Sequence, residues 1–228
     1  MKERPRRGRA AVSERTKIKI CGITNEADGL EAGRLGADFI GFIFYPPSPR
    51  YIEPRRAAEA LRTIREACGP AASPRAIGVF VDEDPARIAA VREEVGLAGV
   101  QFSGDETPEV VARSAPLRIR SLSIETLDRL GRYDVDAYLC DAHAPLEKGG
   151  TGRSYDYETL RPHIPRYPLI VAGGLTPETV GRVVSSLGPW GVDVSSAIES
   201  EPGRKDHARM AAFVRAVRKA CRGEAETY

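Results

Sequence analysis

The stretch that decides the fold is Lys17-Ile18-Lys19-Ile20-Cys21-Gly22-Ile23-Thr24. Its first five residues alternate between polar and β-branched side chains, a pattern typical of a β-strand. Because side chains alternate across a strand, Lys19 and Cys21 share one face, and Ile18 and Ile20 share the other. Polar residues suited to capping a helix follow directly, so we expect Cys21 at the carboxyl end of a strand, just before a strand-to-helix loop.

Cys21 has two interpretations on these residues alone. A lone cysteine at a strand end is most often a small buried hydrophobic residue. In a (β/α)₈ barrel, however, the carboxyl ends of the strands carry the catalytic side chains. The choice between the two depends on how the rest of the chain is arranged.

Strand and helix patterns alternate from Lys17 onward. Strands are expected at 17–21, 38–44, 76–81, 99–102, 117–122, 137–141, 169–172 and 190–194, and helices at 25–35, 54–68, 85–95, from 108, at 124–130, 157–161, 177–187 and 205–221. These units predict an α/β protein, a (β/α)₈ TIM barrel forming a single domain over 17–222, with 223–228 as a tail. An open doubly wound sheet is the alternative, but no Gly-x-Gly-x-x-Gly follows the first strand.

Composition narrows the class of protein. Hydrophobic residues make up 42% of the 228 residues, enough for a large core, and no apolar run reaches the ~18 residues of a membrane span. The amino terminus lacks the apolar core of a secretory signal. The four cysteines, at 21, 68, 140 and 221, form no close pair. This spacing indicates reduced thiols in a cytoplasmic protein, with no metal site.

Residues 1–16 differ from the rest of the chain in charge. They carry six basic and two acidic side chains, whereas the whole chain has a formal net charge of +2. A basic tail can bind nucleic acid, but no aromatic side chain is interleaved with this charge. We therefore interpret 1–16 as a disordered, solvated extension outside the fold, and expect neither a nucleic acid nor a membrane as partner.

Small residues follow the last two predicted strands. Gly173-Gly174 comes after strand 169–172, and Ser195-Ser196 comes after strand 190–194. Small residues let backbone N–H groups converge on an anion, and a helix start after each loop favours negative charge. In barrels these two loops commonly hold phosphate. Turns need glycine anyway, but two such loops together predict that phosphate binds between them.

Asp141 ends the sixth strand as Cys21 ends the first. On its own Asp141 is equally consistent with a helix cap or a turn. Strands one and six are not neighbours in an eight-stranded ring, so their inward side chains can face each other across its mouth. A thiol and a carboxylic acid there suit the base and the acid of a proton transfer on a phosphosugar. Arg50, on the proline-rich loop 45–51, is either a carboxylate ligand or simply exposed.

Closure of the barrel would also make the first and eighth strands neighbours. Lys19 shares the inward face with Cys21, and Asp193 lies on the eighth strand. We therefore expect Lys19 and Asp193 to form an ion pair inside the barrel.

The chain also carries the short motifs Lys19–Thr24, Gly36–Asp38, Gly41–Pro46, Ser48–Ile52, Val79–Val81, Gly149–Gly152, Ala172–Glu178, Asp193–Ser196 and Pro202–Asp206. In this order they resemble the phosphoribosylanthranilate isomerase family of tryptophan biosynthesis. The resemblance covers Lys17 to about Val217, effectively the whole barrel.

The resemblance implies an isomerase that carries out an Amadori rearrangement of N-(5′-phosphoribosyl)anthranilate, a small-molecule phosphosugar, to the 1-deoxyribulose 5-phosphate product without metal or organic cofactor. It implies that Cys21 is the general base for the C2′ proton and Asp141 the general acid for the furanose ring oxygen. It implies that Arg50 binds the anthranilate carboxylate. The phosphate would be held by backbone donors around Gly173, Gly174, Ser195 and Ser196.

Four positions depart from the family pattern, and two alternatives stay open. The family usually has His at the position of Ser103, Lys at Arg120, Trp at Tyr157 and Gly at Ala197. Alanine resists a positive φ, so the alanine at 197 could tighten the phosphate loop. The first alternative is a related isomerase of histidine biosynthesis, but that family has an aspartate at the position of Cys21, so the cysteine argues against it. A phosphate-binding barrel that has lost catalysis is the alternative of another class. Monomer and homodimer are both consistent with the sequence.

The charge pattern of the tail leads to a first prediction. Deletion of residues 1–15 should leave the catalytic rate within about tenfold of the full chain, a difference of less than about 1.4 kcal/mol, because this segment has no apolar periodicity. Steady-state kinetics on both proteins measure the effect, and a larger loss would assign the tail to the site.

Overall fold

Eight parallel strands form the closed barrel that the sequence predicts. The structure is a computed structural model that describes residues 15–141 and 157–223, so residues 1–14 of the predicted extension, the 142–155 loop with its glycine motif and most of the tail lie outside the described residues. The predicted boundary at residue 16 is wrong by two residues, because Arg15 pairs with Asp38 at 2.8 Å and the buried Thr16 hydroxyl donates to the Pro189 carbonyl oxygen at 3.1 Å. The strands are β1 Lys17–Cys21, β2 Phe39–Ile43, β3 Arg75–Phe80, β4 Gly99–Phe102, β5 Arg118–Ser123, β6 Ala137–Asp141, β7 Leu169–Ala172 and β8 Gly191–Val194. β1 pairs with both β2 and β8, which closes the ring.

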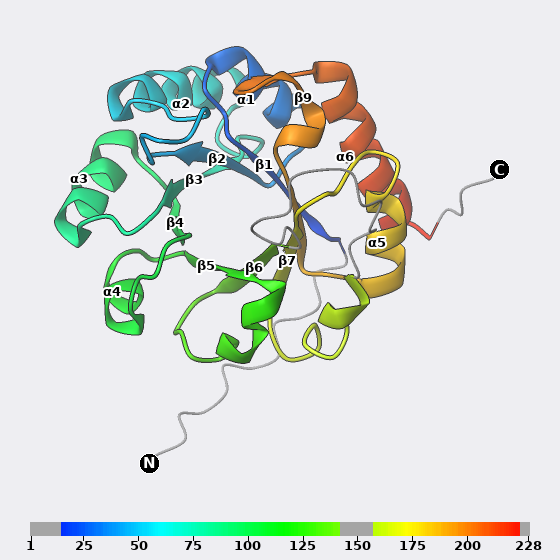
Figure 1. The fold of residues 1–228 in the computed structure, drawn as a ribbon. Helices are drawn as coiled ribbons and strands as arrows, with labels where there is room; N and C mark the ends of the chain where they lie inside the picture. Colours follow the sequence, from blue (N-terminus) through cyan, green and yellow to red (C-terminus); the bar gives the residue numbers. More distant parts are fainter. Residues whose placement is uncertain (1–14, 142–156, 224–228) are drawn as a thin grey trace.

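Helices and short helical turns surround the strands (Figure 1). They are α1 Glu26–Arg34, α2 Pro54–Cys68, α3 Pro85–Val95, α4 Pro108–Arg113, the 3₁₀ turns η1 Ile124–Arg129, η2 Tyr157–Leu160 and η3 Ser196–Ile198, and α5 Val180–Leu187 and α6 His207–Cys221. Among the described residues, none of these helices is long and apolar enough to cross a membrane. The alternation of strand and helix thus matches the sequence pattern closely.

Two helices begin later than the sequence indicates. α5 begins at Val180 rather than Pro177, because Thr179 accepts a hydrogen bond from the backbone of Thr176 and holds the intervening residues in a turn. α6 begins at His207, since the residues before it form an unexpected hairpin of β9 (Glu199–Glu201) and β10 (Arg204–Lys205). Asp206 caps α6 by accepting from the backbone of Arg209.

The strands separate two apolar layers. The inner cluster fills the barrel mainly near the amino ends of the strands, with Trp190 packed against it; it contains Phe39, Ile77, Leu117, Ile119, Ala137, Leu139, Ile170 and Ala172. Residues of opposite parity, such as Ile18 and Ile20, pack outward against the helices. By the same alternation, polar side chains occupy the inner face toward the carboxyl ends, namely Lys19, Cys21, Gln101, Asp141 and Asp193. The barrel is therefore apolar at one end and polar at its mouth.

A buried ion pair lies outside the barrel wall. Arg120 points away from the barrel interior because its neighbour Ile119 belongs to the inner cluster. Its guanidinium meets the Glu106 carboxylate at 2.5 Å, and both side chains are 2% exposed. It also lies 4.9 Å from the ring centre of Tyr133, while Glu106 accepts the backbone N–H of Asp82. This pair ties the loops after β3 and β4 to β5.

Loss of one partner should destabilise the fold. Glu106→Gln leaves the Arg120 charge buried without its counter-ion, so the free energy of unfolding should fall by about 3 kcal/mol or more. Denaturant unfolding measures the change. Asp128→Asn is the matched control, because Asp128 and Arg132 form an exposed pair at 2.8 Å and should contribute less than about 1 kcal/mol. Equal effects of the two substitutions would contradict this account.

Candidate active site at the barrel mouth

Cys21 and Asp141 lie at the carboxyl ends of their strands, at the same end of the barrel. Cys21 is the last residue of β1 and is buried, whereas Asp141 is the last residue of β6 and is partly exposed. β7 and β8 separate the two strands in the ring. The inward parity of both residues places a thiol and a carboxyl group on the polar inner face of the mouth, as the sequence pattern predicts.

The predicted ion pair between Lys19 and Asp193 is confirmed. The two residues are register partners on β1 and β8, and Lys19 Nζ lies 2.8 Å from Asp193 Oδ1. The Lys19 side chain is 1% exposed. The Lys19 ammonium group and the Cys21 thiol both lie against Gly41, so the pair adjoins the proposed base.

Gly41 makes room for this group of side chains. A Cβ atom at this position would lie 2.9 Å from Cys21 Sγ and 3.2 Å from Lys19 Nζ. Both distances are shorter than ordinary van der Waals contact. The glycine of β2 therefore allows the thiol and the ammonium group to lie next to each other inside the barrel.

Burial dominates the acidity of the Cys21 thiol. Removal from water raises the pKa of Cys21, and the nearby Asp193 carboxylate raises it further, while the positive charges of Lys19 and Lys205 act in the opposite direction. The net pKa lies above that of an ordinary thiol. The lysine two residues before Cys21 therefore offsets burial only in part.

Arg50 is held by a carboxylate of the chain itself. Its Nε donates to Glu199 Oε1 at 2.9 Å, and its Nη2 donates to Glu199 Oε2 at 2.7 Å. Glu199 Oε1 also lies 2.8 Å from Lys205 Nζ, and the Lys205 side chain is fully buried. The sequence analysis left Arg50 as a carboxylate ligand or an exposed residue, and the structure places it, partly buried, in an ionic cluster at the mouth.

Glu199 and Lys205 are residues that the sequence analysis did not single out. Lys205 belongs to the motif Pro202–Asp206, which was noted without a role, and Glu199 carried no sequence signal. Lys205 Nζ also lies 3.3 Å from the Ser195 carbonyl oxygen and 3.4 Å from its hydroxyl oxygen. The cluster thus connects Arg50 with the loop after β8.

The two loops expected to hold phosphate differ in local structure from the sequence interpretation. Gly173 and Gly174 have φ values of +80° and +68°, a conformation that favours glycine. The Tyr157 hydroxyl donates to the Gly173 carbonyl oxygen at 2.5 Å and fixes this loop. After β8 only the three-residue turn η3 follows Ser195. Backbone N–H groups, rather than long helices, are therefore the donors available here.

The departures from the family pattern have local explanations. Among the described residues, Asp82 is the one non-glycine residue with a positive φ, so Ala197 is not strained. Ser103 accepts a hydrogen bond from the Gln101 side chain at 3.1 Å. Arg120 lies outside the barrel wall, where it cannot contact a ligand at the mouth.

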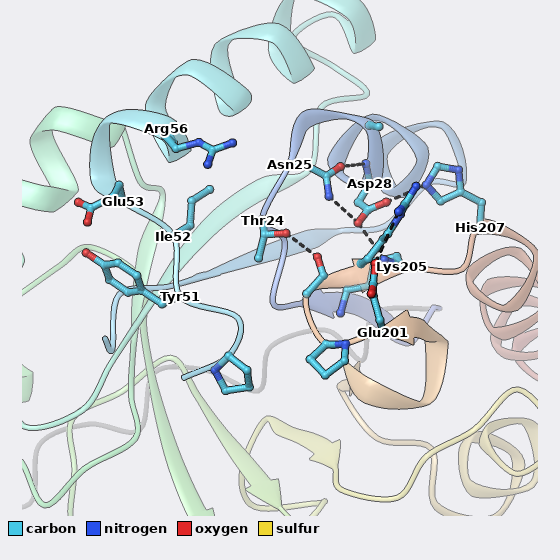
Figure 2. A pocket seen from close by; sticks show the side chains of 15 residues that line it. Thr24, Asn25, Asp28, Tyr51, Ile52, Glu53, Arg56, Glu201, Lys205 and His207 are labelled. Atoms are coloured by element: carbon cyan, nitrogen blue, oxygen red, sulfur yellow. Dashed lines mark hydrogen bonds and ion pairs between the residues drawn. The ribbon is translucent and has the colours of Figure 1, made fainter. Parts of the chain in front are cut away.

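A groove of about 1030 Å³ lies beside the mouth, between the loop after β1, the loop after β2 and the β9–β10 hairpin (Figure 2). Its lining includes Thr24, Asp28, Arg56, Lys205 and His207, but neither Cys21 nor Asp141. Asp28 accepts from the backbone of Lys205 at 2.9 Å and lies 2.8 Å from the His207 ring nitrogen. This contact anchors the hairpin to α1.

Together, these features define a (β/α)₈-barrel protein with a thiol and a carboxyl group at its mouth and small-residue loops after its last two strands. The family model of N-(5′-phosphoribosyl)anthranilate isomerase matches residues 18–216. The isomerase of Trichlorobacter lovleyi is 39% identical over 210 residues, which cover 90% of this chain and 98% of that protein. The chain belongs to the N-(5′-phosphoribosyl)anthranilate isomerase family.

Solved structures agree with this assignment. One similar structure contains monomers generated from the dimeric phosphoribosylanthranilate isomerase of Thermotoga maritima, with a TM-score of 0.75, 32% identity and coverage of 89% of this chain and 98% of that one. Another is a phosphoribosylanthranilate isomerase in complex with reduced 1-(o-carboxyphenylamino)-1-deoxyribulose 5-phosphate. It has a TM-score of 0.73 and 33% identity, and the match covers 91% of this chain and 99% of that one.

The raised pKa of Cys21 gives a prediction for thiol chemistry. In a Cys68→Ser, Cys221→Ser background, alkylation of Cys21 by iodoacetamide should still accelerate above about pH 8.5, because only the thiolate reacts. Mass spectrometry measures the rate. Cys140 is the internal control, since burial and the Asp141 charge raise its pKa to about 12 and should keep it unlabelled. A rate that levels off below neutral pH would contradict the effect of burial.

Proposed function

We propose that this protein catalyses the Amadori rearrangement of N-(5′-phosphoribosyl)anthranilate to 1-(2-carboxyphenylamino)-1-deoxyribulose 5-phosphate, a step of tryptophan biosynthesis. The observation that carries the proposal is the family match over residues 18–216, within which a buried thiol and a carboxyl group end β1 and β6. The similar isomerase bound to the reduced product supports the same substrate class.

In this proposal Asp141 acts first, as the general acid. It gives a proton to the furanose ring oxygen as the C1′–O bond opens, and the anilino nitrogen takes on the positive charge of an iminium ion. Cys21 then acts as the general base and removes the proton from C2′. The electron pair of that bond neutralises the iminium nitrogen and leaves an enolamine, which tautomerises to the ketone. Atoms and electrons balance without an added oxidant or reductant.

The raised pKa of Cys21 suits this role in one respect and limits it in another. A thiolate whose conjugate acid is weaker is a stronger base toward a carbon acid. The same burial lowers the fraction of Cys21 that is ionised at neutral pH. The positive charge of Lys19 lowers the pKa of Cys21 in part, favours the ionised form and so preserves part of the base.

Recognition in the proposal uses the two ends of the substrate. Arg50 binds the anthranilate carboxylate through the guanidinium edge that Glu199 does not occupy. Backbone N–H groups around Gly173, Gly174, Ser195 and Ser196 hold the phosphate.

All these residues come from one chain, so the site is compatible with either a monomer or a homodimer. The four cysteines are free thiols, which supports a cytoplasmic location.

A barrel that binds a phosphate ligand without catalysis is the competing function. The fluorescence decay of freshly prepared phosphoribosylanthranilate in the presence of the protein distinguishes the two. A binding protein would leave the decay at its spontaneous rate, whereas the isomerase would accelerate it. The same assay also distinguishes the proposed activity from that of the related isomerase of histidine biosynthesis, because that enzyme acts on a different substrate.

Removal of the acid or the base should abolish most turnover. Cys21→Ala and Asp141→Asn should each reduce the rate by at least about 100-fold, the usual scale for loss of acid–base catalysis. Calorimetry should find that both variants still bind the reduced product analogue, since neither residue is assigned to carboxylate or phosphate recognition. Cys221→Ala at the end of α6 is the control and should keep full turnover. Near-normal turnover of Cys21→Ala would return this cysteine to a packing role.

A further inference from the structure

The cluster of Arg50, Glu199 and Lys205 contains charged groups that the proposed mechanism leaves without a role. The Glu199 side chain is 4% exposed and the Lys205 side chain is fully buried. Buried charges without partners are strongly destabilising, so buried charged side chains are expected to pair with side chains of opposite charge. Here the negative charge lies between two positive ones.

Glu199 is restrained from several directions. Arg50 approaches one side through Nε and Nη2, at 2.7–3.1 Å from the two carboxylate oxygens. Lys205 Nζ approaches Oε1 at 2.8 Å, and the backbone N–H of Gly203 donates to the same oxygen at 3.4 Å. Burial alone would raise the pKa of Glu199, but the hydrogen bonds from Arg50 and Lys205 lower it overall, so the group is ionised.

The position of Arg50 therefore depends on Glu199. A guanidinium has a planar fork of donors, and Glu199 takes the edge formed by Nε and Nη2. The Arg50 chain also lies over Gly22, where a Cβ atom would come within 2.7 Å of Arg50 Cδ. The orientation of the remaining edge, formed by Nη1 and Nη2, is thereby fixed on a side chain whose Cδ and Cβ lie over the residue that follows Cys21.

The other side of the cluster fixes Ser195. An ammonium group only donates hydrogen bonds, so the Ser195 hydroxyl oxygen must accept from Lys205, 3.4 Å away. The hydroxyl hydrogen is then left to donate elsewhere. The Ser195 oxygen also lies 3.1 Å from the position of a Cβ atom on Gly22. Arg50 and Ser195 thus pack against the same glycine from the two ends of one ionic cluster.

We propose that Glu199 is a positioning residue that orients Arg50 toward the carboxylate of the substrate, while Lys205 holds Glu199 and Ser195 in a fixed relation to it. This inference rests on the proposed function, in which Arg50 binds that carboxylate. In the opposite role Glu199 would compete with the substrate for Arg50, and one of the two side chains would have to move when the ligand binds. Movement of Glu199 would leave the fully buried Lys205 without its counter-ion. Movement of Arg50 would break its hydrogen bonds to a carboxylate that is 4% exposed.

A pair of matched ligands tests the role of Glu199. Calorimetry would compare the reduced product analogue, which carries the carboxylate, with the same compound made from aniline, which lacks it. Glu199→Gln should weaken the first ligand by at least about tenfold, because a small misplacement of a binding group is costly, and leave the second unchanged. In steady state, KM should rise while kcat stays nearly constant. In an Arg50→Met background, Glu199→Gln should have no further effect on either ligand.

Controls keep the outcome interpretable. Glu201→Gln, an exposed side chain on the same hairpin, should change neither ligand. Thermal melting establishes that the variants fold; if Glu199→Gln does not, Glu199→Asp keeps the charge but retracts it, and should produce the same selective loss. Tighter binding of the carboxylate ligand, or equal loss of both ligands, would overturn the proposal. Failure of the wild-type protein to turn over phosphoribosylanthranilate would instead overturn the proposed function.

Discussion

The buried ion pair between Lys19 and Asp193 joins the first strand of the barrel to the last. Its 2.8 Å contact lies where β1 and β8 meet, so it forms only when the ring is closed. A buried ion pair contributes little net stability, because desolvation offsets much of the attraction. Its more important effect is on the neighbouring Cys21, whose pKa reflects the balance between burial and these two opposite charges.

Strand parity determines which residues can take part in chemistry. Cys21 and Asp141 end their strands on the inward parity, whereas Arg120, the third residue of β5, has the outward parity and pairs with Glu106 behind the barrel wall. A shift of one residue in β5 would exchange these environments. The alternation that builds the core therefore also separates residues that hold the loops from residues that face the ligand.

The sequence was sufficient for the strands, their order and the positions of strand-end residues, because these follow from local periodicity. The Lys19–Asp193 pair was predictable for the same reason, once closure was assumed. The Arg50–Glu199 contact was not, since it joins residues 149 positions apart through a hairpin that no local pattern indicated. The raised pKa of Cys21 was also beyond the sequence, which reveals the neighbouring lysine but not the depth of burial.

The two ionic groups at the mouth have different relations to the backbone. Lys19 and Asp193 are on barrel strands, so their positions are set by the strand register. Arg50 is on a loop, Glu199 is the first residue of the short strand β9, and Lys205 is on its partner strand β10. Asp28 of α1 accepts a hydrogen bond from the backbone N–H of Lys205 and so fixes this hairpin (Figure 2). Loops lack the rigidity of a sheet, so side chains that recognise a ligand from loops need other contacts to hold them. The buried carboxylate of Glu199 supplies such contacts to both Arg50 and Lys205. In the proposed positioning role, this is why a charge occupies a place where an apolar residue would avoid the cost of desolvation.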